Sequence, residues 1–125
     1  MSGIVTLWER GGVDPATLRA MHDRLVHRGP DGGDVWEDGD VGLGHQKLRS
    51  TPEGRYDEQP HGEDGLVVTA DARLDNRPEL FSKLQLDAHP ARCPDSRLLL
   101  AAYREWGCAC VDHLVGAYAV VIWDG

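Results

Sequence analysis

The chain begins Met1-Ser2-Gly3-Ile4-Val5, and this stretch decides how the other segments are interpreted. If the initiator Met1 is removed, as expected ahead of a residue as small as serine, the mature chain starts with a hydroxyl side chain that carries its own free amine. An α-amine titrates near about pH 8, so a neutral fraction can take the proton of an adjacent hydroxyl. Ser2 is therefore a candidate nucleophile with its own base. The alternative is that Ser2 only starts a strand.

Length and charge limit the class of protein. The 125 residues fit one domain with a core of its own, and residues 1–125 are predicted to form it. Thirteen basic against 21 acidic residues give a net charge of −8, which disfavours a nucleic-acid or anionic-membrane partner. No apolar run approaches about 18 residues and no signal peptide is apparent, so a cytoplasmic location is expected.

The three cysteines are Cys93, Cys108 and Cys110. An odd number without secretory context disfavours a disulfide framework. Cys108 and Cys110, followed by His113, are possible metal ligands, but their spacing matches no standard zinc pattern and no second ligand pair lies at a matching distance. We predict small buried residues here and no metal site, with a structural zinc as the alternative.

Apolar periodicity and turn residues predict an alternation of strands and helices. Expected helix caps are Asp14, followed by Pro15 at the first helical position, then Asn76, and then Asp95 or Ser96. The dipeptide Asp38-Gly39 predicts a tight hairpin turn. The polar residues 50–64 predict a loop able to move over a site. The expected strands are residues 4–8, 35–37, 41–45, 66–70 and 118–123, and the expected helices run from Asp14 to near His27, onward from Asn76, and from 95 or 96 to about 106.

Six short motifs occur in the order and spacing of one known family, and together they span nearly the whole chain. They are Ser2-Gly3-Ile4-Val5, His27-Arg28-Gly29-Pro30-Asp31, Gly44-His45-Gln46-Lys47-Leu48, Asp71 to Asn76, Pro94-Asp95-Ser96, and Leu114 to Ala119 with Trp123-Asp124. The chain resembles the N-terminal glutaminase domain of asparagine synthetase B-type enzymes, the class II glutamine amidotransferases.

The resemblance implies an α+β fold of the N-terminal-nucleophile hydrolase type, a four-layer αββα sandwich. It also implies that the N-terminal residue attacks the side-chain amide of glutamine, and that ammonia passes to a synthetase domain. That domain uses ATP to activate a carboxylate such as aspartate. Its ATP-binding Ser-Gly-Gly-x-Asp-Ser loop is absent from this sequence, so we expect no ATP site of that kind and no cofactor in the chain.

The site residues implied by the resemblance depart from the family pattern. Ser2 stands where the family has cysteine, and Asp71-Ala72 stands where it has the Asn-Gly pair that stabilises the oxyanion. An ionised Asp71 offers no donor, and losing one costs about 3 kcal/mol of transition-state stabilisation. Lys47 replaces the arginine that binds the glutamine carboxylate, which loses the bidentate geometry. Asp95 matches the acidic residue that holds the glutamine amino group, whereas Arg97 stands where the family has glutamate.

Three functions remain open. The first is an asparagine-synthetase-type glutamine amidotransferase domain whose own glutaminase activity is weak or absent. The second is an amidohydrolase with Ser2 as nucleophile for another amide, and the third a non-catalytic structural or regulatory module of a synthetase. A synthetase domain or chain is the expected partner. Because the sequence stops after Asp124-Gly125, we expect an incomplete sheet whose last strand lacks a partner and self-associates.

Overall fold

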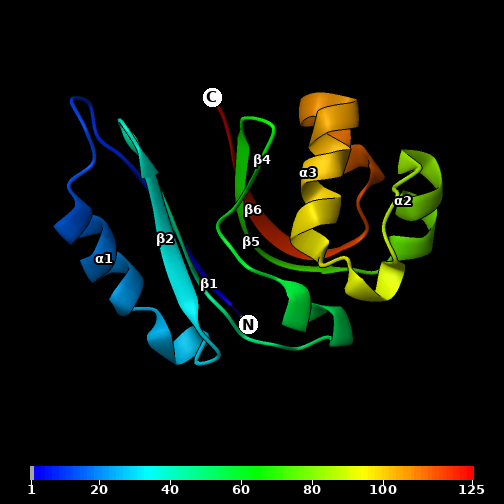
Figure 1. Cartoon of the computed structure of the whole chain (residues 1–125), viewed down its shortest axis with the longest axis horizontal. Coiled ribbons are helices and arrows are strands. Elements are labelled where there is room, and N and C mark those ends of the chain that lie inside the picture. Colours follow the sequence, from blue (N-terminus) through cyan, green and yellow to red (C-terminus); the bar gives the residue numbers. More distant parts are fainter. Residues whose placement is uncertain (1) are drawn as a thin grey trace.

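The structure, a computed structural model, describes residues 2–125, so the expected removal of Met1 lies outside the described residues. The fold is mixed α/β with two antiparallel sheets, ordered β1-β3-β2 and β4-β5-β6 (Figure 1). The strands are β1 (Gly3–Trp8), β2 (Gly33–Asp38), β3 (Val41–Gln46), β4 (His61–Glu63), β5 (Leu66–Leu74) and β6 (Gly116–Asp124). The α-helices are α1 (Pro15–Asp23), α2 (Arg77–Leu84) and α3 (Asp95–Trp106), and the 3₁₀ turns are η1 (Val26–Arg28), η2 (Pro52–Tyr56), η3 (Pro90–Arg92) and η4 (Gly107–His113).

Helix α1 packs against one face of the first sheet, over its central strand β3. The approach is close because Gly42 of β3 has no side chain: a Cβ there would lie 2.8 Å from Leu18 of α1. Leu18 is fully buried as a result. The glycine thus allows the helix to lie directly on the sheet.

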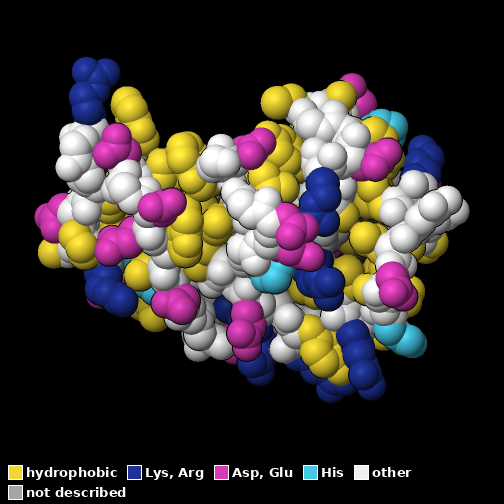
Figure 2. Space-filling model, turned by 45° about the horizontal axis from the view of Figure 1, so that its top comes forward, with side chains coloured by type: hydrophobic (Ala, Val, Ile, Leu, Met, Phe, Trp, Pro, Cys, Tyr) yellow, Lys and Arg dark blue, Asp and Glu magenta, His cyan; other side chains and the backbone are white. Residues whose placement is uncertain are grey.

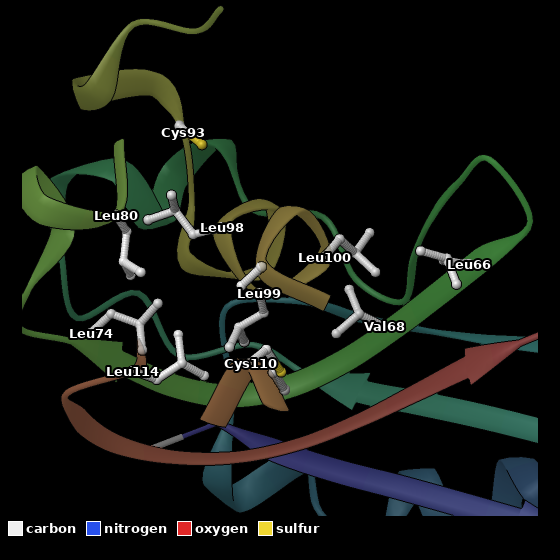
Figure 3. Close-up of a cluster of buried hydrophobic side chains, with 12 residues drawn as sticks. Leu66, Val68, Leu74, Leu80, Cys93, Leu98, Leu99, Leu100, Cys110 and Leu114 are labelled. Carbon is white, nitrogen blue, oxygen red and sulfur yellow. The ribbon is translucent and has the colours of Figure 1, made fainter. Parts of the chain in front are cut away.

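Helices α2 and α3 cover the second sheet on the face turned away from the first (Figure 1). Alternate residues of β5 point towards α3, so this face of the strand is apolar. The resulting cluster of buried residues is the main core (Figure 3): Leu66, Val68, Ala70, Leu74, Leu80, Cys93, Leu98, Leu99, Leu100, Ala102, Cys110 and Leu114. Burying one such leucine contributes about 1.5–3 kcal/mol, which makes this cluster the main source of stability.

The two sheets meet through both apolar and polar contacts. Val41, Leu43 and Val67 form a small buried apolar cluster between them. The Thr69 hydroxyl donates to the carbonyl of Gly44 at 2.9 Å, and it crosses from the second sheet to the first. This side of β5 therefore carries polar groups that the side facing α3 lacks.

The expected helix caps are confirmed at one position of three. Asp14 caps α1 by accepting a hydrogen bond from the Ala16 N–H at 3.2 Å. Asn76 occupies the N-cap position of α2 without capping it, because its amide nitrogen donates to the His113 carbonyl and its amide oxygen accepts from the Val115 N–H. The side chain ties α2 to a segment distant in sequence instead.

The start of α3 also differs from the prediction. Pro94 is the N-cap residue and Asp95 is the first helical residue, so neither Asp95 nor Ser96 caps the helix; both side chains bond elsewhere. The helix does end at Trp106 before Gly107, as predicted. Helix α1 ends at Asp23 rather than near His27, because the Leu25 N–H bonds to the His22 carbonyl and tightens the chain into a 3₁₀ turn.

Two predicted loops differ in the structure: the hairpin turn is shifted by one residue, and the 50–64 loop contains regular structure. Asp38 pairs with Val41, so the hairpin turn is Gly39-Asp40 rather than Asp38-Gly39, with Gly39 at φ 56° in the first turn position. Residues 50–64, predicted to be a loop, contain the η2 turn and strand β4, because the backbone of residues 61–63 pairs with that of residues 66–68.

Strand β6 has a partner, contrary to the prediction. It pairs with β5 along its whole length, from Gly116 opposite Leu74 to Asp124 opposite Leu66. Gly116 starts the strand with φ 149°, where a Cβ would lie 2.0 Å from the Arg73 carbonyl oxygen. Within the described residues β6 is still the last strand of its sheet, so self-association through this edge stays a prediction.

Candidate functional site

One pocket brings together all five residues that the sequence singled out. Its walls include Ser2, Lys47, Asp71, Ala72 and Asp95, and we call it the Ser2 pocket. Ser2 directly precedes β1 and Lys47 directly follows β3, whereas Asp71 and Ala72 belong to β5 and Asp95 starts α3. Ser2 and Asp95 line the same pocket although they are 93 positions apart in sequence, because the two sheets meet at this end. The roles of the five residues stay predictions.

Ser2 is held by contacts from two loops. Its Oγ accepts a hydrogen bond from the Leu48 N–H at 3.0 Å, and its carbonyl accepts one from Arg28 Nε at 3.5 Å. Gly3 allows the close approach of η1, since a Cβ there would lie 3.0 Å from Leu25 Cβ. A backbone N–H aimed at Oγ favours its ionised form, so the contact suits a nucleophile as well as a structural serine.

Lys47 is positioned by the loop of the His27–Asp31 motif. A Cβ on Gly29 would lie 2.2 Å from the carbonyl of Gln46, so only glycine lets this loop lie against the end of β3. The Asp31 N–H donates to the Lys47 carbonyl at 2.9 Å, and the Lys47 N–H donates to the Gly32 carbonyl at 2.6 Å. The same motif therefore holds Ser2, through Arg28, and Lys47.

Asp57 is the residue of this site that sequence reasoning missed. Its carboxylate accepts from Ser96 Oγ at 2.7 Å and from Gln59 Nε2 at 2.7 Å, while its carbonyl accepts from the Lys47 ammonium. Asp57 thereby fixes the 50–60 segment across the pocket, between β3 and α3. No sequence signal distinguishes it, because residues 50–64 contain five acidic side chains.

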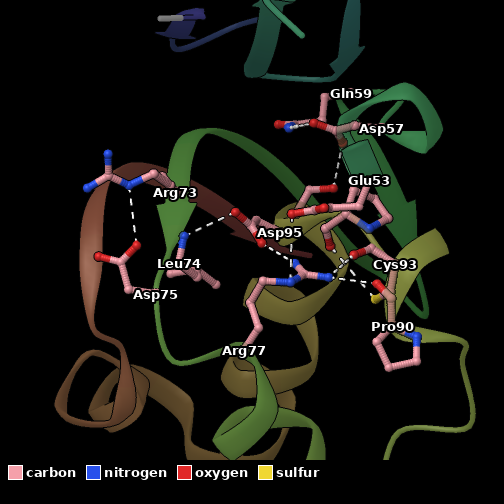
Figure 4. Close-up of polar contacts among 12 residues, drawn as sticks. Glu53, Asp57, Gln59, Arg73, Leu74, Asp75, Arg77, Pro90, Cys93 and Asp95 are labelled. Atoms are coloured by element: carbon pink, nitrogen blue, oxygen red, sulfur yellow. Dashed lines mark hydrogen bonds and ion pairs between the residues drawn. The ribbon is translucent and has the colours of Figure 1, made fainter. Parts of the chain in front are cut away.

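Asp95 is engaged by partners within the chain (Figure 4). One carboxylate oxygen accepts from the Leu74 N–H at 3.1 Å and the other forms an ion pair with Arg77. Arg77 also lies 3.7 Å from Glu53 and donates to the Cys93 carbonyl at 2.7 Å. Burial raises the pKa of Asp95, and the Leu74 N–H and Arg77 oppose that rise. Arg77 was also missed by the sequence analysis.

Asp71 and Ala72 lie within β5, paired with Ala119 and Tyr118 of β6. Ala72 packs against the main core. Asp71 is half-buried, and its carboxylate has no hydrogen-bond partner among residues 2–125. A carboxylate in this position accepts hydrogen bonds and donates none when ionised. A negative charge forming nearby would be repelled.

The space left in the Ser2 pocket is small. It measures about 40 Å³, which holds a few water molecules but not an amino acid. Ser50, Gly54 and Asp57 form the wall from the 50–60 segment. A ligand as large as glutamine therefore does not fit without a change in the walls, to which this segment contributes. Among residues 2–125 no histidine lines the pocket, so no imidazole is placed there as a base for Ser2.

The acidic side chains and the cysteines bear on the other expectations from the sequence. Acidic side chains are scattered rather than gathered on the face seen in Figure 2. Between Ser2 and Gly125, no three His, Cys, Asp or Glu side chains are placed to hold a metal ion. Cys108 is exposed and Cys110 is buried. The His113 ring stacks on the Trp106 ring, with the two ring centroids 3.8 Å apart. No described helix combines the length and apolar character that crossing a membrane requires.

Comparison with known protein families shows where this chain belongs. The family model for the glutamine amidotransferase domain matches residues 1–125. The chain belongs to this family. The resemblance inferred from the six motifs is thereby confirmed, as is the relationship to asparagine synthetases that the curated relatives show.

Three curated relatives illustrate that relationship. An asparagine synthetase [glutamine-hydrolyzing] of Bacillus subtilis is 35% identical over 113 residues, which are 86% of this chain and 18% of the relative. Asparagine synthetase [glutamine-hydrolyzing] 1 of Arabidopsis thaliana is 34% identical over 103 residues, 81% of this chain and 17% of the relative. Amidase chry2 of Gibberella zeae is 29% identical over 111 residues, 86% of this chain and 16% of the relative. The chain thus spans less than a fifth of each.

Proposed function

We propose that this chain is the glutamine amidotransferase domain of an asparagine-synthetase-like amide ligase, with a weak or lost glutaminase activity of its own. The observation that carries the proposal is the Ser2 pocket, where Ser2, Lys47 and Asp95 surround one small space. The names of the relatives support a synthetase domain or chain, absent from these 125 residues, as the partner. That partner would use the ammonia in ATP-dependent amide formation.

The arrangement of helices and sheets supports the finer fold assignment. We assign the chain to the N-terminal-nucleophile hydrolase fold, with α1 outside one sheet and α2 and α3 outside the other. In that fold Ser2, freed of Met1, would attack the glutamine side-chain amide with its own amine as base. Lys47 would face the substrate carboxylate and Asp95 its ammonium group.

Three features support a weak activity. An alcohol is harder to activate than a thiol, so Ser2 attacks more slowly than the family's cysteine. Asp71 faces the pocket with an acceptor-only group, where a donor contributes about 3 kcal/mol, or a hundredfold or more in rate. The 50–60 segment, held by Asp57, leaves about 40 Å³ for a substrate.

A second candidate function is an amidohydrolase in which Ser2 attacks a different amide. The observation that favours it is the Ser2 Oγ contact with the Leu48 N–H inside the pocket. The name of the Gibberella zeae relative, an amidase, points the same way. A non-catalytic module would instead retain the pocket without turnover.

The test is ammonia release from glutamine by five forms of the protein: the wild type, Ser2→Cys, the double variant Asp71→Asn/Ala72→Gly, the triple variant that combines all three changes, and Ser2→Ala. We expect little activity from the wild type and from Ser2→Cys, because a better nucleophile still generates an oxyanion facing Asp71. Adding Asp71→Asn and Ala72→Gly to Ser2→Cys should raise the rate by more than the product of the separate effects, since attack and charge stabilisation act in one transition state. Ser2→Ala gives the background rate, and circular dichroism checks that every form is folded.

Two outcomes would contradict the proposal. Wild-type hydrolysis at ordinary enzyme rates, about 1–10³ s⁻¹, would make Ser2 a working catalytic replacement. A folded triple variant that binds glutamine without hydrolysing it would show that Asp71 and Ala72 do not occupy the oxyanion site.

The N-terminal residue is tested by intact mass. We expect the purified protein to start at Ser2, because only then is the amine free to act as base. A mass that includes Met1 would remove that base and leave the non-catalytic function.

A further inference from the structure

A cavity larger than the Ser2 pocket adjoins it and is separate from it. It measures about 460 Å³, within the range of small-molecule sites. Lys47, Asp57 and Gln59 form the wall that the two spaces share. His45 lines only the larger one, which we call the His45 cavity. A ligand of amino-acid size fits there without movement of the 50–60 segment.

His45 presents a hydrogen-bond acceptor to this cavity. Its side chain is almost fully buried, with 2% of the residue exposed, and Nε2 lies 3.0 Å from the Ala70 carbonyl oxygen. A carbonyl only accepts, so Nε2 carries the proton and Nδ1 of the neutral ring carries a lone pair. Burial lowers the pKa of His45, which keeps the ring neutral although Asp57 and Asp71 oppose the shift.

The Nδ1 lone pair opens onto the cavity. No side chain or backbone group of residues 2–125 donates to it. Every fully buried polar side-chain atom of the described chain has a partner, so Nδ1 must reach accessible space. Of the two spaces, the His45 cavity is the one that His45 lines. A nearly buried histidine thus has an acceptor that receives no hydrogen bond from residues 2–125, and it lines this cavity.

The charges around the cavity are predominantly negative. Asp31, Asp34 and Glu58 line it and form no ion pair with another described residue. Asp57 is the fourth carboxylate, and the cations Lys47 and Arg49 line the cavity together with the histidines His45 and His61. The four carboxylates and two cations leave a net charge of −2, which attracts a cation.

We propose that the His45 cavity binds the primary ammonium group of a small amine or amino acid. One ammonium N–H donates to His45 Nδ1, and the positive charge lies among Asp34, Asp57 and Glu58. A quaternary ammonium has the same charge but no N–H to donate, so it binds more weakly. The site is distinct from the Ser2 pocket and does not depend on glutaminase activity.

The experiment is a titration of the ¹⁵N-labelled protein with methylammonium chloride, followed through the His45 ring signals. We expect saturable shifts of His45 and of backbone signals from residues 31–34 and 57–62. Tetramethylammonium should shift them less at equal concentration. The Asp34→Asn and Glu58→Gln variants should each weaken methylammonium binding about fivefold, the effect of one unit charge at about 4 Å in water.

Matched controls separate site binding from general charge effects. Glu37→Gln removes an exposed carboxylate of β2 that does not line the cavity, and should leave the affinity unchanged. Ser2→Ala should also leave it unchanged, because Ser2 lies in the other pocket. Equal shifts with both cations, linear shifts without saturation, or a loss of binding in Ser2→Ala would each overturn the proposal.

Discussion

The two faces of strand β5 differ sharply in what they contribute. Towards α3 the strand presents Leu66, Val68 and Ala70 to a dry apolar cluster. Towards the first sheet it presents Thr69, which bonds to Gly44, and it continues into Asp71 at the Ser2 pocket. Adjacent residues of one strand thus serve stability on one side and polar contacts near the candidate site on the other. Substitutions on each side should therefore have effects of different size and kind.

The largest expected effect comes from the apolar side. Leu99 of α3 is 1% exposed within the main core, so Leu99→Ala should lower the free energy of unfolding by about 2–5 kcal/mol through lost burial and a cavity. Urea unfolding followed by circular dichroism measures it. Val115→Ala, at a residue 56% exposed, is the control and should change stability by less than about 0.5 kcal/mol. Equal losses would show that the cluster is not the main source of stability.

The second effect concerns the 50–60 segment, which lies over the Ser2 pocket near the polar face of β5, and we expect it to be local. Asp57→Ala removes the acceptor of Ser96 and Gln59, so we expect a loss of about 1–3 kcal/mol and faster amide exchange in residues 50–60. The Lys47 contact with the Asp57 carbonyl remains in the variant. Glu58→Ala, at the exposed neighbour, is the control. Unchanged exchange in the Asp57 variant would mean that other contacts hold this segment over the Ser2 pocket.

A smaller effect is expected where the two sheets meet. Thr69→Val keeps the shape of the side chain but removes one neutral hydrogen bond to the Gly44 carbonyl, with an expected cost of about 1 kcal/mol. Thermal unfolding measures it, with Thr6→Val at an exposed position of β1 as the control. A neutral or stabilising result would indicate that apolar contacts alone hold the sheets together.

The smallest effect is a change in pH dependence. The folded-state pKa of His45 is lowered by burial, so below the ordinary histidine value of about 6.5 the unfolded chain binds a proton that the folded chain does not. The contribution of His45 to stability is therefore complete above about pH 6.5 and falls as the pH drops towards the folded-state pKa. His45→Gln, whose amide can still donate to the Ala70 carbonyl, should flatten this slope.

Charged groups around His45 also act on its pKa. Asp57 and Asp71 act to raise its pKa, and Lys47 acts to lower it. His27→Gln, at an exposed histidine, is the matched control. An unchanged slope in His45→Gln would show that His45 takes up its proton equally in the folded and unfolded chains.

Local sequence determined much of the framework. The Asp14 cap, the Gly107 end of α3 and the apolar strand at residues 66–70 depend on residues a few positions apart, and they appear as predicted. The motifs also identified the family, and the five residues chosen from them line one pocket. The predicted C-terminal end of α1 was wrong by a few residues and the predicted hairpin turn by one, because single backbone hydrogen bonds decide such boundaries.

Only the tertiary structure decided which polar side chains meet. Asn76 resembled a cap by its position, yet it bonds across 37 residues to His113. Asp57 and Arg77 had no distinguishing neighbours in sequence, because their partners Ser96 and Asp95 lie 39 and 18 residues away. The sequence alone does not distinguish a solvated carboxylate or guanidinium from one that forms an ion pair or hydrogen bond within the fold. Its partner is set by how the sheets and helices pack, since burial makes an unpaired polar group costly and so selects the contacts that form.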